Sequence, residues 1–345
     1  MLMKLKAPFP YFGGKSKVAD IVWERFGDVP NYVEPFAGSL AVLLGRPHEP
    51  KTETVNDKDC FISNFWRALQ ADPETVAHYA EWPVNENDLH ARHAWLTGRR
   101  ENIQSRMEGN PEYYDARAAG WWVWGISCWI GSGWCSGAGP WRVAGGELLN
   151  AGGVGQGVNR KRPHLGDAGR GVHRKLPHLK DAGQGIKRNL PHLRNAGQGV
   201  QRKLHADELM GYMGALAERL REVRVCCGDW SRVCGPSVTF IHGMTAVFLD
   251  PPYSHGLRDK SLYRVEMPIA DQVRGWALEN GDNPLLRLAL CGYEGEHEMP
   301  GWECVPWKTA GGYGSQGNGM GRDNAARERI WFSPHCLKAS QMELF

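Results

Sequence analysis

The feature that most constrains the fold of this chain is the stretch "NYVEPFAGSLAVLLG", residues 31 to 45. It predicts a short strand over residues 31 to 33 that ends in an acid, Glu34, followed by a turn through Gly38 into an apolar helix. This is the βα unit of nucleotide-binding sheets, in which a glycine lets a ligand approach the backbone. A second predicted strand, "TETVND", ends in Asp57, where a carboxylate can accept hydrogen bonds from ribose hydroxyls.

The stretch "PYFGGKSKVADIVWERF" precedes this unit and places two glycines and Lys15 immediately before an amphipathic helix. Val18, Ile21, Val22 and Phe26 share one face of that predicted helix. A lysine beside a helix N-terminus favours a carboxylate or phosphate ligand. The alternative is that Lys15 is a solvated surface lysine.

A third motif, "AVFLDPPYSH" at residues 246 to 255, is an apolar run that ends in Asp250, Pro251, Pro252 and Tyr253. The prolines fix the backbone, so that the Asp250 carboxylate and the Pro251 carbonyl can accept the two hydrogens of an exocyclic amine. Tyr253 can stack on a nucleobase, provided that the base is flipped out of a duplex. The structural alternative is a strand that ends in a Pro-Pro turn.

Taken in order, these motifs resemble those of the Dam-type (D12 class) DNA adenine-N6 methyltransferases, in a form typical of phages and prophages. The matching stretches are "YFGGK" (11–15), "VEPFAGS" (33–39), "VNDKD" (55–59), "CGDW" (227–230) and "FLDPPY" (248–253), with later strands at "LALCGY" (288–293) and "RERIWFS" (327–333). Leu40 stands where many members carry a glycine. The resemblance implies an α/β fold with a Rossmann-like, doubly wound, seven-stranded sheet. It also implies methyl transfer from S-adenosylmethionine to the N6 amine of a flipped adenine in DNA.

The resemblance further implies a role for each motif residue. The catalytic group would be Asp250, Pro251, Pro252 and Tyr253. The cofactor would be bound at its methionine part by Tyr11 and Lys15, along the turn by Glu34, Phe36 and Gly38, at the ribose by Asp57, at the adenine amine by Asp229, and beside the catalytic group by Asp250. Asp229 has a structural alternative as the N-cap of a helix that begins at "WSRV". No metal is expected.

The motifs occupy both ends of the chain, which predicts one catalytic domain built from residues 1–60 and 223–345. The inserted region, residues 61–222, is expected to be mostly helical and to read the DNA target. Its predicted helices cover residues 60–70, 87–97, 111–130 and 206–222.

In residues 150 to 204 of the inserted region a pattern of roughly the form "DAGQGVxRKLPHL" recurs every 14 residues. Between residues 158 and 203 there are 12 Lys or Arg and two acids, whereas the whole chain carries a net charge of only +3. This segment therefore indicates a polyanionic partner, DNA, whose phosphates the basic residues could follow. The predicted contacts are Arg160, Lys161, Arg174, Lys175, Lys187, Arg188, Arg202 and Lys203. The alternatives are a linker without a role and a metal site at His164, His178 and His192, which lack partner ligands.

Six of the 15 tryptophans lie between Trp121 and Trp141. Trp121, Trp122, Trp124 and Trp129 follow a helical spacing, which predicts packing in a core. The glycine-rich loop that follows offers a second possibility, a surface on which unpaired bases stack.

No apolar stretch approaches the roughly 20 residues that span a bilayer, and no signal peptide is present, so we expect a cytoplasmic protein of a bacterial host cell without membrane contact. Nine cysteines without paired spacing indicate reduced thiols. Cys226, Cys227 and Cys234 are expected to be buried thiols rather than zinc ligands. A monomer or weak dimer is expected, with no nuclease in the same chain.

Two other functions remain open from the sequence. Cytosine N4 methylation uses a similar exocyclic amine, and only the size of the pocket would separate it from adenine methylation. The second is a nucleic-acid-binding protein on a methyltransferase scaffold that has lost turnover, although the intact motif at residues 250 to 253 argues against it.

Overall fold

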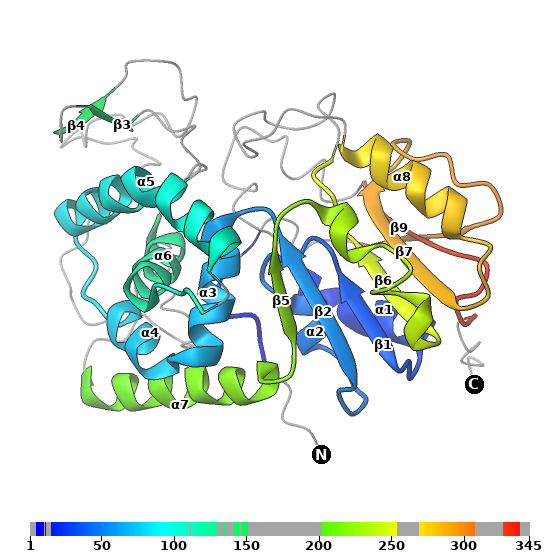
Figure 1. Cartoon of the computed structure of the whole chain (residues 1–345), viewed down its shortest axis with the longest axis horizontal. Coiled ribbons are helices and arrows are strands. Elements are labelled where there is room, and N and C mark those ends of the chain that lie inside the picture. Colours follow the sequence, from blue (N-terminus) through cyan, green and yellow to red (C-terminus); the bar gives the residue numbers. More distant parts are fainter. Residues whose placement is uncertain are drawn as a thin grey trace, which may run out of the picture.

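The structure is a computed structural model that shows one mixed sheet beside a block of helices (Figure 1). It describes residues 5–9, 11, 15–110, 112–129, 134–135, 141–144, 147–150, 202–253, 269–307 and 327–338, with backbone alone for 141–144, 147–150 and 202–207.

The sheet has seven strands in the order β5-β2-β1-β6-β7-β9-β8. Their bounds are β1 (Asn31–Glu34), β2 (Thr52–Asp57), β5 (Arg224–Cys227), β6 (Thr245–Leu249), β7 (Leu286–Tyr293), β8 (Glu303–Pro306) and β9 (Glu328–Phe332). The first five strands in that order are parallel, and β9 runs antiparallel to both β7 and β8. The predicted doubly wound, seven-stranded α/β sheet is therefore confirmed.

Each face of the sheet has its own apolar core. Side chains alternate along β6, so that Ala246 and Phe248 pack in the core with α1 (Ala19–Phe26) and α2 (Ala41–Leu44). Val247 and Leu249 point to the opposite face and pack with α8 (Ile269–Asn280) and the short 3-10 helix η2 (Trp230–Val233). Two further 3-10 helices are η1 (Lys15–Lys17) and η3 (Phe240–His242).

The helical block lies beside the β5 edge of the sheet (Figure 1). Its members are α3 (Cys60–Ala71), α4 (Pro73–Ala80), α5 (Glu86–Gly109), α6 (Ala116–Cys128) and α7 (Arg202–Leu220). Its buried side chains, such as Phe65 and Trp122, belong to the same core as α1 and α2. The block therefore packs as a continuation of one face of the sheet.

The helices expected in this block need three corrections. The helix predicted at 87–97 extends to Gly109, because its polar second half is still anchored by buried Ile103 and Met107. The helix predicted at 111–130 begins only at Ala116, after Asp115 caps it by accepting the Ala118 N–H. Neither α4 nor the antiparallel hairpin of β3 (Trp141–Ala144) and β4 (Glu147–Asn150) was predicted.

Candidate active site

The two central strands, β1 and β6, mark the point at which the strand order reverses. From β1 the sheet continues through β2 to β5, and from β6 it continues in the other direction through β7. Ligands of open α/β sheets bind outside the carboxyl ends of the strands at such a switch point. β1 ends in Glu34, and Asp250 directly follows β6, so two predicted site residues lie at this position.

Alternation along the strands places both acids on the same face of the sheet. Tyr32 and Phe248, two residues before Glu34 and Asp250, pack in the core that contains α1. The turn of η1, which carries Lys15, leads directly into α1. The fold therefore brings the N-terminal motif and the Asp250 motif together from opposite ends of the chain.

Lys15 makes the contact that joins these motifs. Its Nζ lies 3.1 Å from Asp250 Oδ1 and 3.8 Å from Glu328 Oε2. It also donates a hydrogen bond of 3.0 Å to the Tyr253 hydroxyl. Lys15 is only 7% exposed. The alternative that Lys15 is a solvated surface lysine is wrong.

The charges around Lys15 fix its protonation. Burial alone would lower the pKa of this lysine, but the carboxylates of Asp250 and Glu328 outweigh burial and raise the pKa well above its ordinary value. Lys15 is therefore a permanent cation inside the site. Burial raises the pKa of Glu34 well above its usual range, even though its carboxylate accepts a hydrogen bond of 2.9 Å from the Tyr32 hydroxyl.

Tyr253 is held at both its ring and its hydroxyl. The hydroxyl lies 2.8 Å from Glu328 Oε2 and 3.3 Å from Asp250 Oδ1. The ring packs edge-on against Tyr293 with 4.6 Å between centroids, and the residue is 5% exposed. The ring therefore has one orientation relative to the Asp250 carboxylate.

The turn after β1 requires glycine at position 38. Gly38 has a φ of 46°, and a side-chain carbon there would lie 2.6 Å from the ring of Tyr11. Leu40 follows with a φ of 55°, a left-handed conformation that costs a non-glycine residue roughly 1–2 kcal/mol. Leu40 is fully buried in the core, which offsets that cost. Leu40 thus keeps the left-handed backbone conformation that glycine favours, although many members of the similar family carry a glycine there.

Asp57 ends β2 next to this turn, and its carboxylate is held by backbone groups alone. Oδ2 accepts the Gly38 N–H at 3.0 Å, and Oδ1 accepts the Asp59 N–H at 2.8 Å. Burial raises the pKa of Asp57 to about 7, against the lowering effect of these hydrogen bonds. A carboxylate that is oriented in this way, with no cation of the described residues in contact with it, fits the hydroxyl donors of a ribose.

Phe36 and Asp229 lie near the other face of the sheet. Phe36 stacks on Trp230, with 6.2 Å between ring centroids and 26° between ring planes. The exposed Asp229 carboxylate caps η2 by accepting the Ser231 N–H at 3.0 Å, as its structural alternative predicted. It also accepts the Ser231 hydroxyl, and this bond holds the pKa of Asp229 below its usual value. The cap does not preclude a ligand contact.

The predicted DNA contacts cannot be placed in this site. Arg160, Lys161, Arg174, Lys175, Lys187 and Arg188 lie outside the described residues, as do the 14-residue repeats and the periodic histidines. Arg202 and Lys203 lie in the first turn of α7, of which the structure describes the backbone.

The tryptophan-rich segment is described in part. Trp122 and Trp124 of α6 are buried, as predicted from their helical spacing. Arg92 of α5 stacks over Trp124 with 4.2 Å between the guanidinium carbon and the ring centroid. The glycine-rich loop beyond α6 lies mostly outside the described residues.

Sequence reasoning missed three residues that border Lys15 or Tyr253. Glu328 begins β9 and is 4% exposed. Trp307 follows β8, and Lys15 Nζ lies 5.0 Å from the centroid of its ring. Tyr293 ends β7 and packs against Tyr253. The only signal in the sequence concerned Glu328, an acid at the start of a predicted strand. An acid at such a position does not by itself indicate a functional site.

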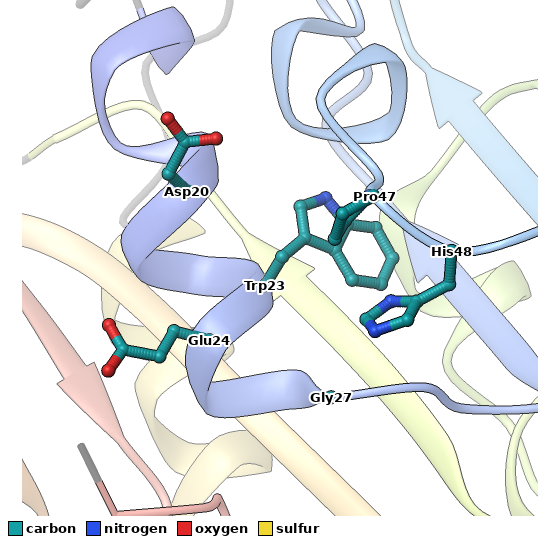
Figure 2. Close-up of a pocket in the computed structure, with 6 residues that line it drawn as sticks. All are labelled: Asp20, Trp23, Glu24, Gly27, Pro47 and His48. Carbon is teal, nitrogen blue, oxygen red and sulfur yellow. The ribbon is translucent and has the colours of Figure 1, made fainter. Parts of the chain in front are cut away.

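A separate shallow pocket of about 360 Å³ lies along α1, away from this cluster. In Figure 2, Trp23 lies next to Pro47 and His48, while the carboxylates of Asp20 and Glu24 point away from it. The Trp23 indole N–H is already bonded to the Val42 carbonyl at 2.7 Å. The pocket contains none of the predicted site residues.

The described part of the chain offers neither a metal site nor a helix that could span a membrane. It contains no group of three or more His, Cys, Asp or Glu side chains arranged to hold a metal ion. None of its helices has both the length and the apolar character that a membrane span needs. All nine cysteines are free thiols, of which Cys234 is buried and Cys226 and Cys227 are partly buried.

Residues 11–118 match the family described as D12 class N6 adenine-specific DNA methyltransferase. The match covers less than half of the chain, so over this stretch the protein is similar to that family. As this match implies, the protein uses S-adenosylmethionine to methylate adenine in DNA at N6, so the alternatives of cytosine methylation and of binding without catalysis are set aside. The matched stretch includes Tyr11, Lys15, Gly38 and Asp57, and it ends before Asp250. A comparison with curated proteins found no match.

Proposed function

We propose that the cluster around Lys15 and Asp250 is the methyl-transfer centre of this D12 class enzyme. One observation carries the proposal: the 3.1 Å contact between Lys15 Nζ and Asp250 Oδ1 at the switch point of the sheet. It unites the N-terminal motif, which lies in the family match, with the Asp250 motif, which lies outside it.

In this proposal, Asp250 makes the adenine amine nucleophilic. The N6 lone pair is delocalised into the ring, and accepting both amine hydrogens, one at Asp250 and one at the Pro251 carbonyl, would localise it on nitrogen. Lys15 and Tyr253 engage Oδ1, whereas Oδ2 has no hydrogen-bond donor among the described residues. Oδ2 is therefore the oxygen that would accept the amine hydrogen.

S-adenosylmethionine would supply a sulfonium methyl group to this nitrogen, and the sulfur would keep the electron pair of the broken bond. The nitrogen becomes cationic as the new N–C bond forms, and it returns to neutrality by losing one proton, for which Asp250 is the acceptor in this scheme. Pro252 fixes the backbone beside Pro251. Tyr253 would stack on the flipped base, with its ring oriented through its hydroxyl.

The cofactor contacts are proposed from the same arrangement. Asp57, at the end of β2, would accept the ribose hydroxyls. Lys15 and Tyr11 would face the methionine part. The remaining contacts would come from Glu34, Phe36 and Gly38 along the turn and from Asp229 at the adenine amine. The carboxylate of Asp57, which is oriented by the backbone of Gly38 and Asp59, supports this placement most strongly.

The region of residues 61–222 is proposed to read the DNA target, and the remaining residues to form the catalytic domain. Its basic repeats would contact phosphates, which position a protein on DNA but do not specify a sequence. Deleting residues 166 to 193 should then flatten the salt dependence of DNA binding and leave the sequence preference intact. We further propose a monomer or weak dimer that acts on DNA in the bacterial cytoplasm, of phage or prophage type.

The test is to sequence DNA for N6-methyladenine in cells that lack their own adenine methylation and express the protein. The intact protein should introduce methyl groups at a recurring sequence, and Asp250→Ala should introduce none at equal protein levels. Methylation that persists in Asp250→Ala would move the catalytic centre elsewhere. Absence of methylation by the intact protein would contradict the activity itself.

A further inference from the structure

Glu328 is a buried acid that no motif of the sequence accounts for. Strand β9 pairs with β7 in the register Tyr293↔Glu328, so the two residues lie opposite each other at the edge where β7 ends. Both reach Tyr253: Tyr293 packs against its ring, and Glu328 Oε2 lies 2.8 Å from its hydroxyl. The C-terminal hairpin of the sheet thus contacts the catalytic motif at two points.

The distances around the Tyr253 hydroxyl decide where its single proton goes. Lys15 Nζ, at 3.0 Å, can only donate to the hydroxyl oxygen. The hydroxyl can then donate to Glu328 at 2.8 Å or to Asp250 at 3.3 Å. The shorter distance favours Glu328 as the main acceptor of that proton, with Asp250 Oδ1 as the more distant one.

We propose that Glu328 is a positioning residue for methyl transfer, which acts by accepting the Tyr253 hydroxyl and by sharing Lys15 with Asp250. The inference rests on the proposed function of Asp250 and Tyr253. Glu328 touches neither base nor cofactor in this scheme. Without the Glu328 carboxylate, the hydroxyl that orients the Tyr253 ring would lose its nearer acceptor. Lys15 would also lose one of its two counter-charges.

The proposal predicts an effect on turnover rather than on binding. Glu328→Gln keeps the size of the side chain and removes its charge. The expected result is a fall in kcat of about tenfold, as for a hydrogen bond needed in the transition state, with the KM values for DNA and cofactor changed by less than about threefold. The matched control is Glu294→Gln, an exposed acid paired with Arg329 at the same end of β9, which should keep the kcat of the unaltered protein.

A double-mutant cycle separates positioning from a general structural role. Tyr253→Phe removes the hydroxyl and keeps the ring, and it should also lower kcat by about tenfold. If Glu328 acts through that hydroxyl, the double variant should be no slower than either single variant. Independent effects would instead multiply to about a hundredfold.

The experiment measures the transfer of labelled methyl groups to adenine-unmethylated DNA, with thermal unfolding of each variant recorded in parallel. Multiplying effects, or a Glu328→Gln variant as fast as Glu294→Gln, would overturn the proposal. If Glu328→Gln does not fold, Tyr253→Phe decides alone, because full activity without the hydroxyl would contradict the role of the contact. An inactive unaltered protein would instead count against the proposed function, so the two failures are distinguishable.

Discussion

Two acids on the same strand, Glu53 and Asp57 of β2, have opposite surroundings. Glu53, near the amino end of the strand, is 2% exposed and lies 3.1 Å from Arg46 and 2.7 Å from Arg219. Asp57, at the carboxyl end, accepts hydrogen bonds from the backbone of Gly38 and Asp59. Two guanidinium groups neutralise the Glu53 carboxylate, whereas no cation in the described part of the chain contacts the Asp57 carboxylate.

The difference distinguishes an acid that stabilises the fold, Glu53, from an acid that can bind a ligand, Asp57. Arg219 belongs to α7, so its contact with Glu53 fastens the returning helix to the sheet. A saturated group of this kind has no capacity left for a ligand. Asp57 is oriented but not neutralised, and its pKa is raised to about 7, which leaves it ready for donors that a ligand brings.

The largest expected effect on stability comes from breaking the saturated group. Glu53→Ala should lower the free energy of unfolding by about 3–5 kcal/mol, because it leaves the buried guanidinium of Arg46 and the partly buried guanidinium of Arg219 without the carboxylate that they share. Urea unfolding measures this loss. The control Glu218→Ala removes an exposed acid of α7 and should cost less than about 1 kcal/mol. Equal losses for the two variants would contradict the distinction.

A smaller effect, on binding instead of stability, is expected at the other end of the strand. Asp57→Asn should weaken S-adenosylmethionine binding by about 1.5–3 kcal/mol, the value of charge-assisted hydrogen bonds. Calorimetry measures the change, with Asp28→Asn, an exposed acid paired with Lys51, as the control that should bind normally. An unchanged dissociation constant in Asp57→Asn would remove this residue from the cofactor site.

The pH dependence sharpens the same comparison. Because the pKa of Asp57 is raised to about 7, the folded protein keeps a proton between pH 4 and 7 that the unfolded chain has lost. Asp57 therefore makes stability fall as pH rises through that window. Ribose hydroxyls favour the ionised form, so cofactor affinity should rise with pH up to about 7. Both trends should be weaker in Asp57→Asn, and identical trends would contradict the assignment.

The parts of the fold that the sequence predicted are those with local signals. β1, β2 and β6 are apolar runs that end in an acid or a turn, and Gly38 marks the turn within the same short stretch. Asp72 shows where a local signal was ambiguous. Its N–H donates to the Ala68 carbonyl at the end of α3, and its side chain caps α4. One residue therefore both ends a helix and begins the next, and the second helix was not predicted.

The parts that escaped prediction depend on pairing between distant segments. Glu328 reaches Tyr253 only because β9 pairs with β7 in one antiparallel register, and a shift by one residue would turn its side chain to the other face. Lys15 shows the same limit of prediction from sequence. Its position before a helix indicated an anion site but did not show which group Lys15 contacts. Its partner Asp250 became apparent only from the strand order.

The most direct test of the account is the rate of a single methyl transfer by Asp250→Asn, measured with S-adenosylmethionine and DNA both prebound. The substitution keeps the shape of the side chain and removes the charged acceptor, so the rate should fall by about 100-fold or more. The ligands are prebound and the variant is checked for folding, so the rate reports the transfer step; Asp271→Asn, in an exposed ion pair on α8, is the control whose rate should be unchanged. A rate within about threefold of the unaltered protein would contradict the assignment of Asp250 as the catalytic acceptor.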